Sequence, residues 1–150
     1  MTEIKVETEI AAPRDEVFSL VLDPNRLGEW VSAHRGVSEV PAGELRKGSE
    51  FRQALSLAGS PFHVRWRVAE LERPSLVVWE GKGPGGSKAT VRYELSENGD
   101  GTTFTYVNDY SLPGGPLGAA AGKVTSRPAQ HAMNTTLRNL KRLLESNESR

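Results

Sequence analysis

The sequence predicts an α+β protein in which one long C-terminal helix lies across a curved antiparallel sheet. Two observations lead to this fold class. Apolar and polar residues alternate along most of the chain between Val37 and Leu112, with turn-forming segments between the runs. The last third of the chain carries apolar residues at helical spacing, and such a stripe needs a surface to pack against. Because short connections favour antiparallel neighbours, we expect one sheet whose apolar face receives the helix.

The N-terminal part of the chain is expected to form one strand and two short helices. Residues Ile4 to Ile10 alternate between apolar and polar side chains, which is typical of a half-buried strand. Pro13 suits the first position of a helix, because its missing N–H costs no hydrogen bond there. Asp23 and Pro24 repeat this signal for the start of a helix, so the sequence predicts a bend near Asp23 between two short helices.

Six further strands are predicted, and turn-forming residues separate them. Their approximate ranges are 35–41, 48–57, 61–73, 75–82, 87–96 and 101–112. In the segment from Phe62 to Val68 the apolar side chains share one face, and His63, Arg65 and Arg67 share the other. The sheet is therefore expected to have one apolar face and one hydrated face.

The segment from about Pro116 to Ser146 is predicted to be helical. Pro128 removes one backbone hydrogen bond and clashes with the preceding turn, so a kink or break is expected there. Such a break would separate a mobile, lid-like first half from a second half docked on the sheet. The apolar residues of this segment are Leu117, Ala120, Ala121, Val124, Met133, Leu137, Leu140 and Leu144.

The composition is that of a single soluble domain, residues 1–150. Lys plus Arg equals Asp plus Glu at 19 each, which gives no general attraction to nucleic acids or anionic membranes. The absence of cysteine excludes a disulfide framework, a thiol nucleophile and a thiolate metal site. The sequence shows no N-terminal signal region and no apolar run of transmembrane length. We therefore expect a cytoplasmic monomer or homodimer without stable membrane insertion.

Three short motifs and the order of the predicted elements resemble the START-like (SRPBCC) superfamily, also called the polyketide cyclase/dehydrase and lipid-transport group. Ala12 to Phe18 (APRDEVF) resembles the start of the family's first helix, and Asp23 to Trp30 (DPNRLGEW) resembles its second helix. Gly99 to Thr103 (GDGTT) resembles the hairpin before its last strand. The resemblance covers nearly the whole chain. It concerns fold more than function, because these motifs are caps, a core tryptophan and a turn.

The resemblance implies a helix-grip architecture, in which a seven-stranded antiparallel sheet wraps around the C-terminal helix and leaves a ligand cavity between them. The superfamily includes carriers, sensors, cyclases and resistance proteins, so the fold alone assigns no activity. It offers no catalytic motif shared across its members that could be transferred to this chain.

The histidines and carboxylates give only weak candidates for catalysis. His34, His63 and His131 form no ligand-spaced pair, so neither a metal site nor a cofactor is expected. His34 and His63 are expected to be solvated. His131 follows Pro128 by about one turn; pointing inward, it would hydrogen-bond a ligand or act as a general base, and packing or exposure is the alternative. Asp109, near the end of the last strand, is the other candidate acid or base, with a solvated strand end as its alternative.

Aromatic residues in the predicted strands favour a site for a flat, largely apolar ligand. A cavity of about 300 Å³ would cost about 7 kcal/mol if empty, which is comparable with a domain's stability of about 5–15 kcal/mol. For any single aromatic residue, ordinary core packing is the alternative. The predicted ligand-binding residues are Trp66, Trp79, Tyr93, Phe104, Tyr106, Tyr110, Leu117 and Val124.

Three functions remain open at this point. The first is non-catalytic binding of a small hydrophobic molecule, such as a polyketide, a lipid or an aromatic metabolite. The second is an aromatic polyketide cyclase or dehydrase, in which His131 or Asp109 would move a proton in the same pocket. The third is a partner-binding module that uses the sheet exterior and has a collapsed interior.

Overall fold

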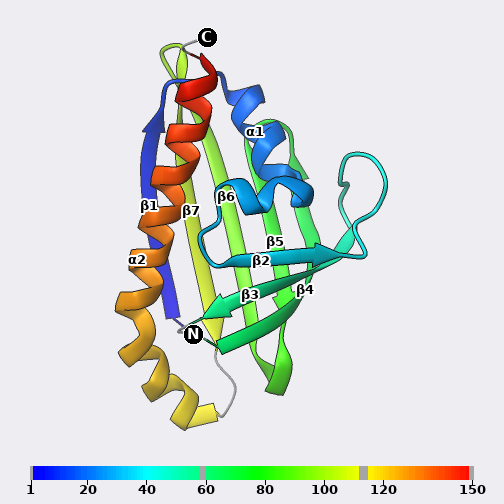
Figure 1. The fold of residues 1–150 in the computed structure, drawn as a ribbon, viewed down its shortest axis with the longest axis vertical. Helices are drawn as coiled ribbons and strands as arrows, with labels where there is room; N and C mark the ends of the chain where they lie inside the picture. Colours follow the sequence, from blue (N-terminus) through cyan, green and yellow to red (C-terminus); the bar gives the residue numbers. More distant parts are fainter. Residues whose placement is uncertain (1, 58–59, 112–114, 149–150) are drawn as a thin grey trace.

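Seven antiparallel strands form one curled sheet, and a long C-terminal helix runs along it (Figure 1). The structure is a computed structural model that describes the backbone of residues 2–57, 60–111 and 115–148, and the side chains of residues 3–56, 61–111 and 130–146. The strands are β1 (Thr2–Ile10), β2 (His34–Ser38), β3 (Glu50–Leu57), β4 (Ser60–Glu72), β5 (Leu76–Lys82), β6 (Lys88–Asn98) and β7 (Gly101–Ser111). The helices are α1 (Arg14–Leu22), the short 3₁₀ segments η1 (Pro24–Glu29) and η2 (Pro84–Gly86), and α2 (Gly115–Glu148).

The strand order confirms the predicted helix-grip α+β fold. The order in the sheet is β1-β7-β6-β5-β4-β3-β2, so consecutive strands from β2 to β7 are neighbours and β1 closes the sheet beside β7. The predicted ranges differ from the observed ones by at most three residues. The largest difference is at β2, which ends at Ser38 because Glu39 adopts a left-handed conformation with φ 57°.

The predicted bend between the first two helices lies at Asp23. Its side-chain Oδ1 accepts a hydrogen bond from the Asn25 backbone N–H at 3.0 Å, and Pro24 follows as the first residue of η1. The second helix is a 3₁₀ helix, which is the usual form of so short a segment. Trp30, directly after η1, is 1% exposed and contacts Tyr93 and Phe104 edge-on. The bend therefore brings the tryptophan onto the apolar face of the sheet.

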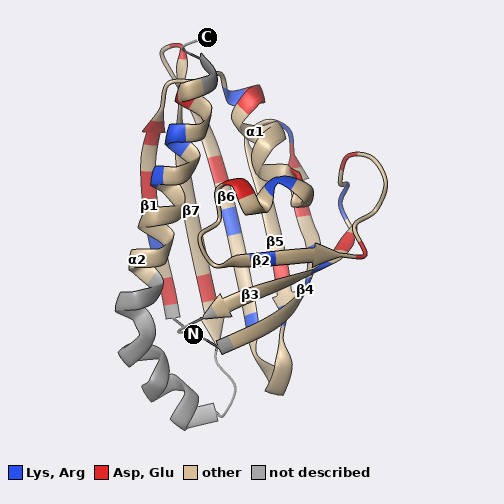
Figure 2. Ribbon diagram, viewed as in Figure 1, with Lys and Arg blue, Asp and Glu red and all other residues tan. Residues whose placement is uncertain are grey.

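Alternation along the strands separates an inner, concave face from an outer face, as predicted. In β4, Val64, Trp66 and Val68 are buried, whereas His63 and its neighbours of the same parity are exposed. A register shift at Ala69 then changes the parity, so that Leu71 rather than Glu70 or Glu72 joins the inner face. Acidic and basic residues are mixed over the sheet and the helices (Figure 2).

Helix α2 places its apolar stripe against the sheet. Met133, Leu137, Leu140 and Leu144 are each at most 5% exposed, and the helix packs mainly against β1. The helix is continuous from Gly115 to Glu148, so it is not divided at Pro128 as the sequence had suggested.

Two polar contacts fix α2 to the segment that follows η1. The Thr136 hydroxyl accepts the Ser32 backbone N–H at 3.0 Å, and the Ser32 hydroxyl donates to the Ala132 carbonyl at 3.1 Å. One turn further along, the Asn139 side-chain amide donates to the Trp30 carbonyl at 3.2 Å. The helix, the η1 segment and the sheet therefore form three walls around one interior.

Replacing Leu140, which is fully buried, tests this packing. Leu140→Ala should lower the free energy of unfolding by about 3 kcal/mol, because it removes apolar contacts and leaves a void against the sheet. Arg142→Ala, at an exposed position of the same helix, should change it by less than about 0.5 kcal/mol. Urea unfolding monitored by tryptophan fluorescence measures both values. If both variants lowered the free energy of unfolding by the same small amount, the apolar stripe of α2 would not be packed against the sheet.

Candidate functional site

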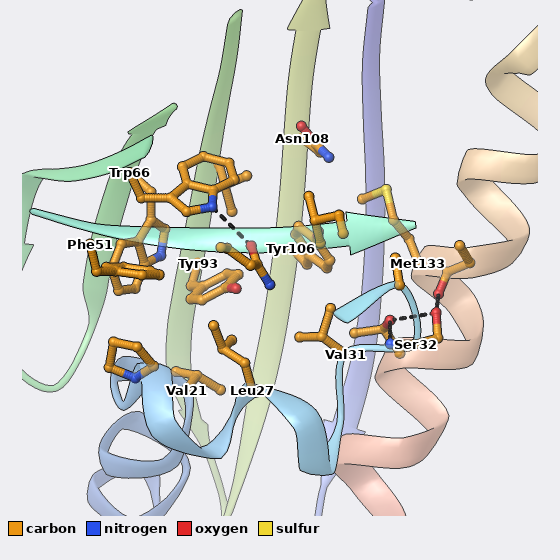
Figure 3. A pocket seen from close by; sticks show the side chains of 18 residues that line it. Val21, Leu27, Val31, Ser32, Phe51, Trp66, Tyr93, Tyr106, Asn108 and Met133 are labelled. Carbon is orange, nitrogen blue, oxygen red and sulfur yellow. Dashed lines mark hydrogen bonds between the residues drawn. The ribbon is translucent and has the colours of Figure 1, made fainter. Parts of the chain in front are cut away.

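A cavity of about 140 Å³ lies between the concave face of the sheet, the η1 segment and α2 (Figure 3). In Figure 3, Phe51, Trp66, Tyr93 and Tyr106 lie on the sheet side, and Val21, Leu27 and Val31 close the opposite side. Met133 of α2 and Ser32 complete the wall near the helix. The remaining lining residues are Pro24, Ala33, Gln53, Leu55, Trp79, Val91, Asn108, Ala132 and Thr136.

Aromatic side chains form the sheet side of the cavity, and the register of the strands brings them together. Tyr93 of β6 lies opposite Tyr106 of β7, with ring centroids 5.4 Å apart, and Tyr93 also contacts Trp79 at 6.0 Å. Trp79 in turn contacts Phe51 at 5.8 Å. These pairs are edge-to-face, which is the arrangement that the charge distribution of aromatic rings favours. The rings support one another and leave their free surfaces toward the cavity.

Trp66 owes its position to a glycine on the neighbouring strand. Gly81 lies directly opposite Trp66, and a Cβ atom built on Gly81 would stand 2.6 Å from Trp66 Cζ3. No larger residue fits there unless the indole moves. Gly81 therefore lets the indole ring lie flat over β5, which brings Trp66 to the cavity wall.

A hydrogen-bonded chain fixes the polar end of Trp66. The indole Nε1–H donates to Gln53 Oε1 at 2.9 Å, and Gln53 Nε2 lies 2.9 Å from His34 Nδ1. Because the indole only donates, the Gln53 oxygen must face it, and the Gln53 amide must then donate to His34. His34 Nδ1 is thus the acceptor, and the neutral ring carries its proton on Nε2. Burial lowers the pKa of His34, which agrees with a neutral imidazole.

Two tyrosines and one asparagine form the polar part of the sheet wall. Burial raises the pKa of Tyr106 to about 12, with the neighbouring Asn108 side chain acting in the opposite direction. Burial also raises the pKa of Tyr93 well above its ordinary value, and the nearby Tyr106 adds to this effect. Both phenols therefore stay neutral near pH 7 and can donate a hydrogen bond to a ligand.

Four of the predicted ligand-binding residues come together at this cavity. Trp66, Trp79, Tyr93 and Tyr106 line it, and their role in binding stays a prediction. Phe104 is fully buried behind Tyr93 and packs in the core instead. The remaining candidates are Tyr110, which is half-buried and not part of the lining, and Leu117 and Val124, whose side chains lie outside the described residues.

The two candidate acid–base residues, His131 and Asp109, are not among the residues that line the cavity. His131 is exposed on α2, because it lies two residues before Met133 and thus on the other side of the helix. Asp109 has the opposite strand parity to Tyr106 and Tyr110, so its side chain extends from the outer face of the sheet. The cavity geometry therefore gives no support to either residue as a catalyst, and their role stays a prediction.

Sequence reasoning missed three polar residues of the site. His34 was expected to be solvated but is partly buried against Gln53. Gln53 and Asn108 are polar residues at inward-facing positions of β3 and β7. Apolar residues are expected at such positions, so the sequence could have identified both as candidates for the site. The partner of each polar group lies on another strand or loop, so sequence spacing could not supply the contacts.

Among the described residues, no group of three or more His, Cys, Asp and Glu side chains is arranged to hold a metal. None of the helices in the described part of the chain combines the length and hydropathy needed to span a membrane.

Comparison with known proteins places this geometry in a family. The family described as "Polyketide cyclase / dehydrase and lipid transport" matches residues 1–145. The chain belongs to this family. This result confirms the resemblance seen in the helix and hairpin motifs, and it is consistent with a ligand-binding domain.

Individual relatives support the same fold. Rv1546 of Mycobacterium tuberculosis is 25% identical over 138 residues, which cover 89% of this chain and 94% of that protein. Rv0088 of the same organism is 40% identical over 73 residues, or 47% of this chain, and the match spans only 32% of that protein. The structure of TTHA0849 from Thermus thermophilus superposes with a TM-score of 0.78 at 15% identity, over 97% of this chain and 99% of that one. At this identity the structural likeness establishes the fold alone.

Stability should depend on pH through His34. The folded protein lowers the pKa of this imidazole, so the unfolded chain binds the proton more readily. The free energy of unfolding should therefore fall as the pH drops below about 6.5, the ordinary pKa of histidine. Urea unfolding at several values between about pH 7 and pH 5 measures this slope, in a range above the ordinary titration of carboxylates.

Two variants separate His34 from other titrating groups. His34→Gln, which cannot take up a proton, should flatten the pH dependence, whereas His63→Gln, at an exposed position, should retain it. If both variants keep the wild-type slope, burial does not hold His34 in its neutral form.

Proposed function

We propose that this protein binds a small hydrophobic molecule in the cavity between the sheet, the η1 segment and α2. The observation that carries the proposal is an interior space of about 140 Å³ with an aromatic wall and a few fixed polar groups. Binding sites for small molecules commonly combine these features. The family description names lipid transport beside cyclase and dehydrase activities, and each of these involves a small molecule, which supports the proposal.

An empty cavity of this kind is costly to the fold. At about 24 cal/mol per Å³, a sealed, dry void of 140 Å³ would cost about 3 kcal/mol, against a stability of about 5–15 kcal/mol. This cavity is partly open to solvent, so its cost is lower than that figure. Larger side chains at Val91 or Ala132 would fill the space. That small residues occupy these positions supports a use for the cavity.

The volume narrows the choice of ligand. The cavity has about half the volume of 300 Å³ that marks the lower end for ligand sites, since pockets for drug-sized ligands measure about 300–1,000 Å³. An apolar cavity of about 150 Å³ in another protein is large enough for benzene. Of the polyketide, lipid and aromatic-metabolite classes, a compact aromatic molecule therefore fits best.

Catalysis by a cyclase or dehydrase mechanism is the second candidate, because the family description names it. Removing a proton from a carbon needs a base close to the ligand. Among the described residues that line the cavity there is no imidazole or carboxylate, and Tyr93 and Tyr106 have raised pKa values. Tyrosines in this state can polarise a carbonyl group but are not bases near pH 7. Binding is therefore the better supported of the two functions.

The third hypothesis, a partner-binding module, predicts a collapsed interior. The cavity does not fit that expectation. A partner could still use the outer face, but nothing in that role requires aromatic side chains around an open space.

Toluene and phenol are suitable probes of the proposed binding, because each is the size of one aromatic ring. At a hundredfold excess over the dissociation constant, a ligand bound only to the folded state adds about 2.7 kcal/mol of stability. For a domain of this size the melting temperature should rise by about 5–10 °C. Thermal unfolding followed by circular dichroism measures the shift.

A cavity-filling variant provides the control for the site. Ala132→Leu should fill the space and reduce the thermal shift with either probe, while leaving the protein folded. Asn134→Leu introduces the same side chain at an exposed position of the same helix and should retain the wild-type shift. Binding in this cavity would be contradicted if neither probe stabilised the wild-type protein. It would also be contradicted if the two variants showed the same thermal shift.

A further inference from the structure

A row of basic side chains crosses the outer face of the sheet. Arg52 of β3 lies directly opposite Arg65 of β4, and Arg65 lies opposite Lys82 of β5. Lys82 in turn lies opposite Lys88 of β6, so four neighbouring strands each contribute one exposed cation. These four residues form the basic row. Because neighbouring strands lie about 4.8 Å apart, the row spans about 14 Å.

The charge pattern of the basic row is unfavourable for stability, because like charges directly opposite each other on a sheet repel. The adjacent row on the same face shows the favourable alternative. There Arg67 lies between Glu50 and Glu80, and it forms an ion pair with Glu80. Stability alone favours such alternation, so the uniform charge of the basic row points to a use outside folding.

The protein balances only part of the charge of the basic row. The Glu39 carboxylate lies 3.5 Å from Arg52 Nε and 3.6 Å from Arg65 Nη2. The Glu50 carboxylate lies 3.6 Å from Arg65 Nη1. These distances exceed the usual length of a hydrogen bond, so both guanidinium groups keep donors available. Within the described part of the chain, the two lysines of the row form no ion pair.

Glu39 marks a position between the two arginines that an anionic oxygen can occupy. It directly follows Ser38, which lies opposite Arg52, and its backbone has φ 57°, a left-handed conformation that is uncommon for glutamate. The same carboxylate oxygen, Oε2, makes both of its contacts with the guanidinium groups. A ligand oxygen would take this position when the Glu39 side chain moves aside.

The basic row borders a groove of about 430 Å³ that is separate from the interior cavity. Arg52, Arg65 and Lys82 line the groove, together with His63 and Phe62. No described residue lines both the groove and the cavity. The volume lies within the range of about 300–1,000 Å³ that is typical of small-molecule sites.

We propose that this groove binds a small molecule that carries two or more phosphate charges. Four cations face two nearby carboxylates, so the row keeps an excess of two positive charges. Phosphate oxygens match the forked donors of arginine, and lysine binds them as a point charge. A ligand with two phosphate groups contacts cations from several strands at once. This site is independent of the hydrophobic binding proposed for the interior.

Inorganic pyrophosphate and orthophosphate are suitable probes of the groove. Isothermal titration calorimetry of the intact chain at neutral pH and low salt gives their dissociation constants. Pyrophosphate should bind at least about tenfold more tightly than orthophosphate, because it places a second charged group on the row. Its affinity should fall when salt is added, because the site is exposed to solvent.

Variants at exposed positions show whether the basic row provides the affinity. Arg65→Gln and Lys82→Gln should each weaken pyrophosphate binding about tenfold, because each removes a charged hydrogen-bond donor. Arg92→Gln makes the same charge change on the outer face of β6, opposite Val78 and outside the row, and should keep the wild-type affinity. Circular dichroism spectra check that each variant is folded, as expected for surface substitutions.

Glu39→Gln should have the opposite effect. It removes the carboxylate that competes for the two arginines, so pyrophosphate should bind about threefold more tightly. Glu94→Gln makes the same change at an exposed position of β6 outside the groove and should leave the affinity unchanged.

The outcomes separate this inference from a general effect of charge and from the proposed function. The inference is overturned if pyrophosphate does not bind at millimolar concentration, or binds no more tightly than orthophosphate. Equal losses in Lys82→Gln and Arg92→Gln, or an unchanged affinity in Glu39→Gln, would also overturn it. Toluene binding to the interior cavity should be the same in all these variants, so each of the two proposals can fail without the other.

Discussion

The alternation of side chains along the strands is the constraint on which the rest of this structure depends. Each inner position of β4 to β7 contributes to the core or to the cavity, and each outer position faces away. A register change of one residue would exchange the two sets, placing Arg65 and Arg67 inside and Trp66 outside. The burial of charge in that alternative would cost far more than the fold can supply. The strand register therefore defines the inner face independently of how the helices pack on it.

Once the inner face is fixed, its side-chain sizes decide where the interior stays open. Large rings at Trp79, Tyr93 and Phe51 contact one another edge-on, so they cannot collapse into the space above Val91. Gly81 adds to the effect, because Trp66 occupies the room that a side chain there would need. On the opposite side, the Ser32–Thr136 contacts hold α2 at a defined position against the η1 segment. The cavity therefore results from rigid aromatic walls around the small side chain of Val91, and not from loose packing.

The sequence was sufficient for the fold because the decisive signals are local. Alternation, turn residues and the spacing of Met133, Leu137, Leu140 and Leu144 each involve neighbours along the chain. The candidate acid–base residues could have been tested by the same local rules. Asp109 lies between Asn108 and Tyr110 and so faces away from both, and His131 is two residues from Met133, about 200° around the helix. The sequence had left exposure or a solvated strand end as the alternative for these two residues, and side-chain direction favours a position outside the cavity for both.

The polar network of the site could not be predicted in this way. The contact between Gln53 and His34 joins β3 to the start of β2 across an irregular stretch of that ladder, and the one between Gln53 and Trp66 joins two strands. Their existence depends on exact rotamers, which the alternation does not specify. Sequence could only indicate that Gln53 and Asn108 are polar residues at apolar positions. Such residues cost stability unless they are satisfied, and at Asn108 Oδ1 the protein does not supply the partner. The rule that polar groups avoid unpaired burial therefore marks Gln53 and Asn108 as exceptions in the sequence, but it does not name the partner of either residue.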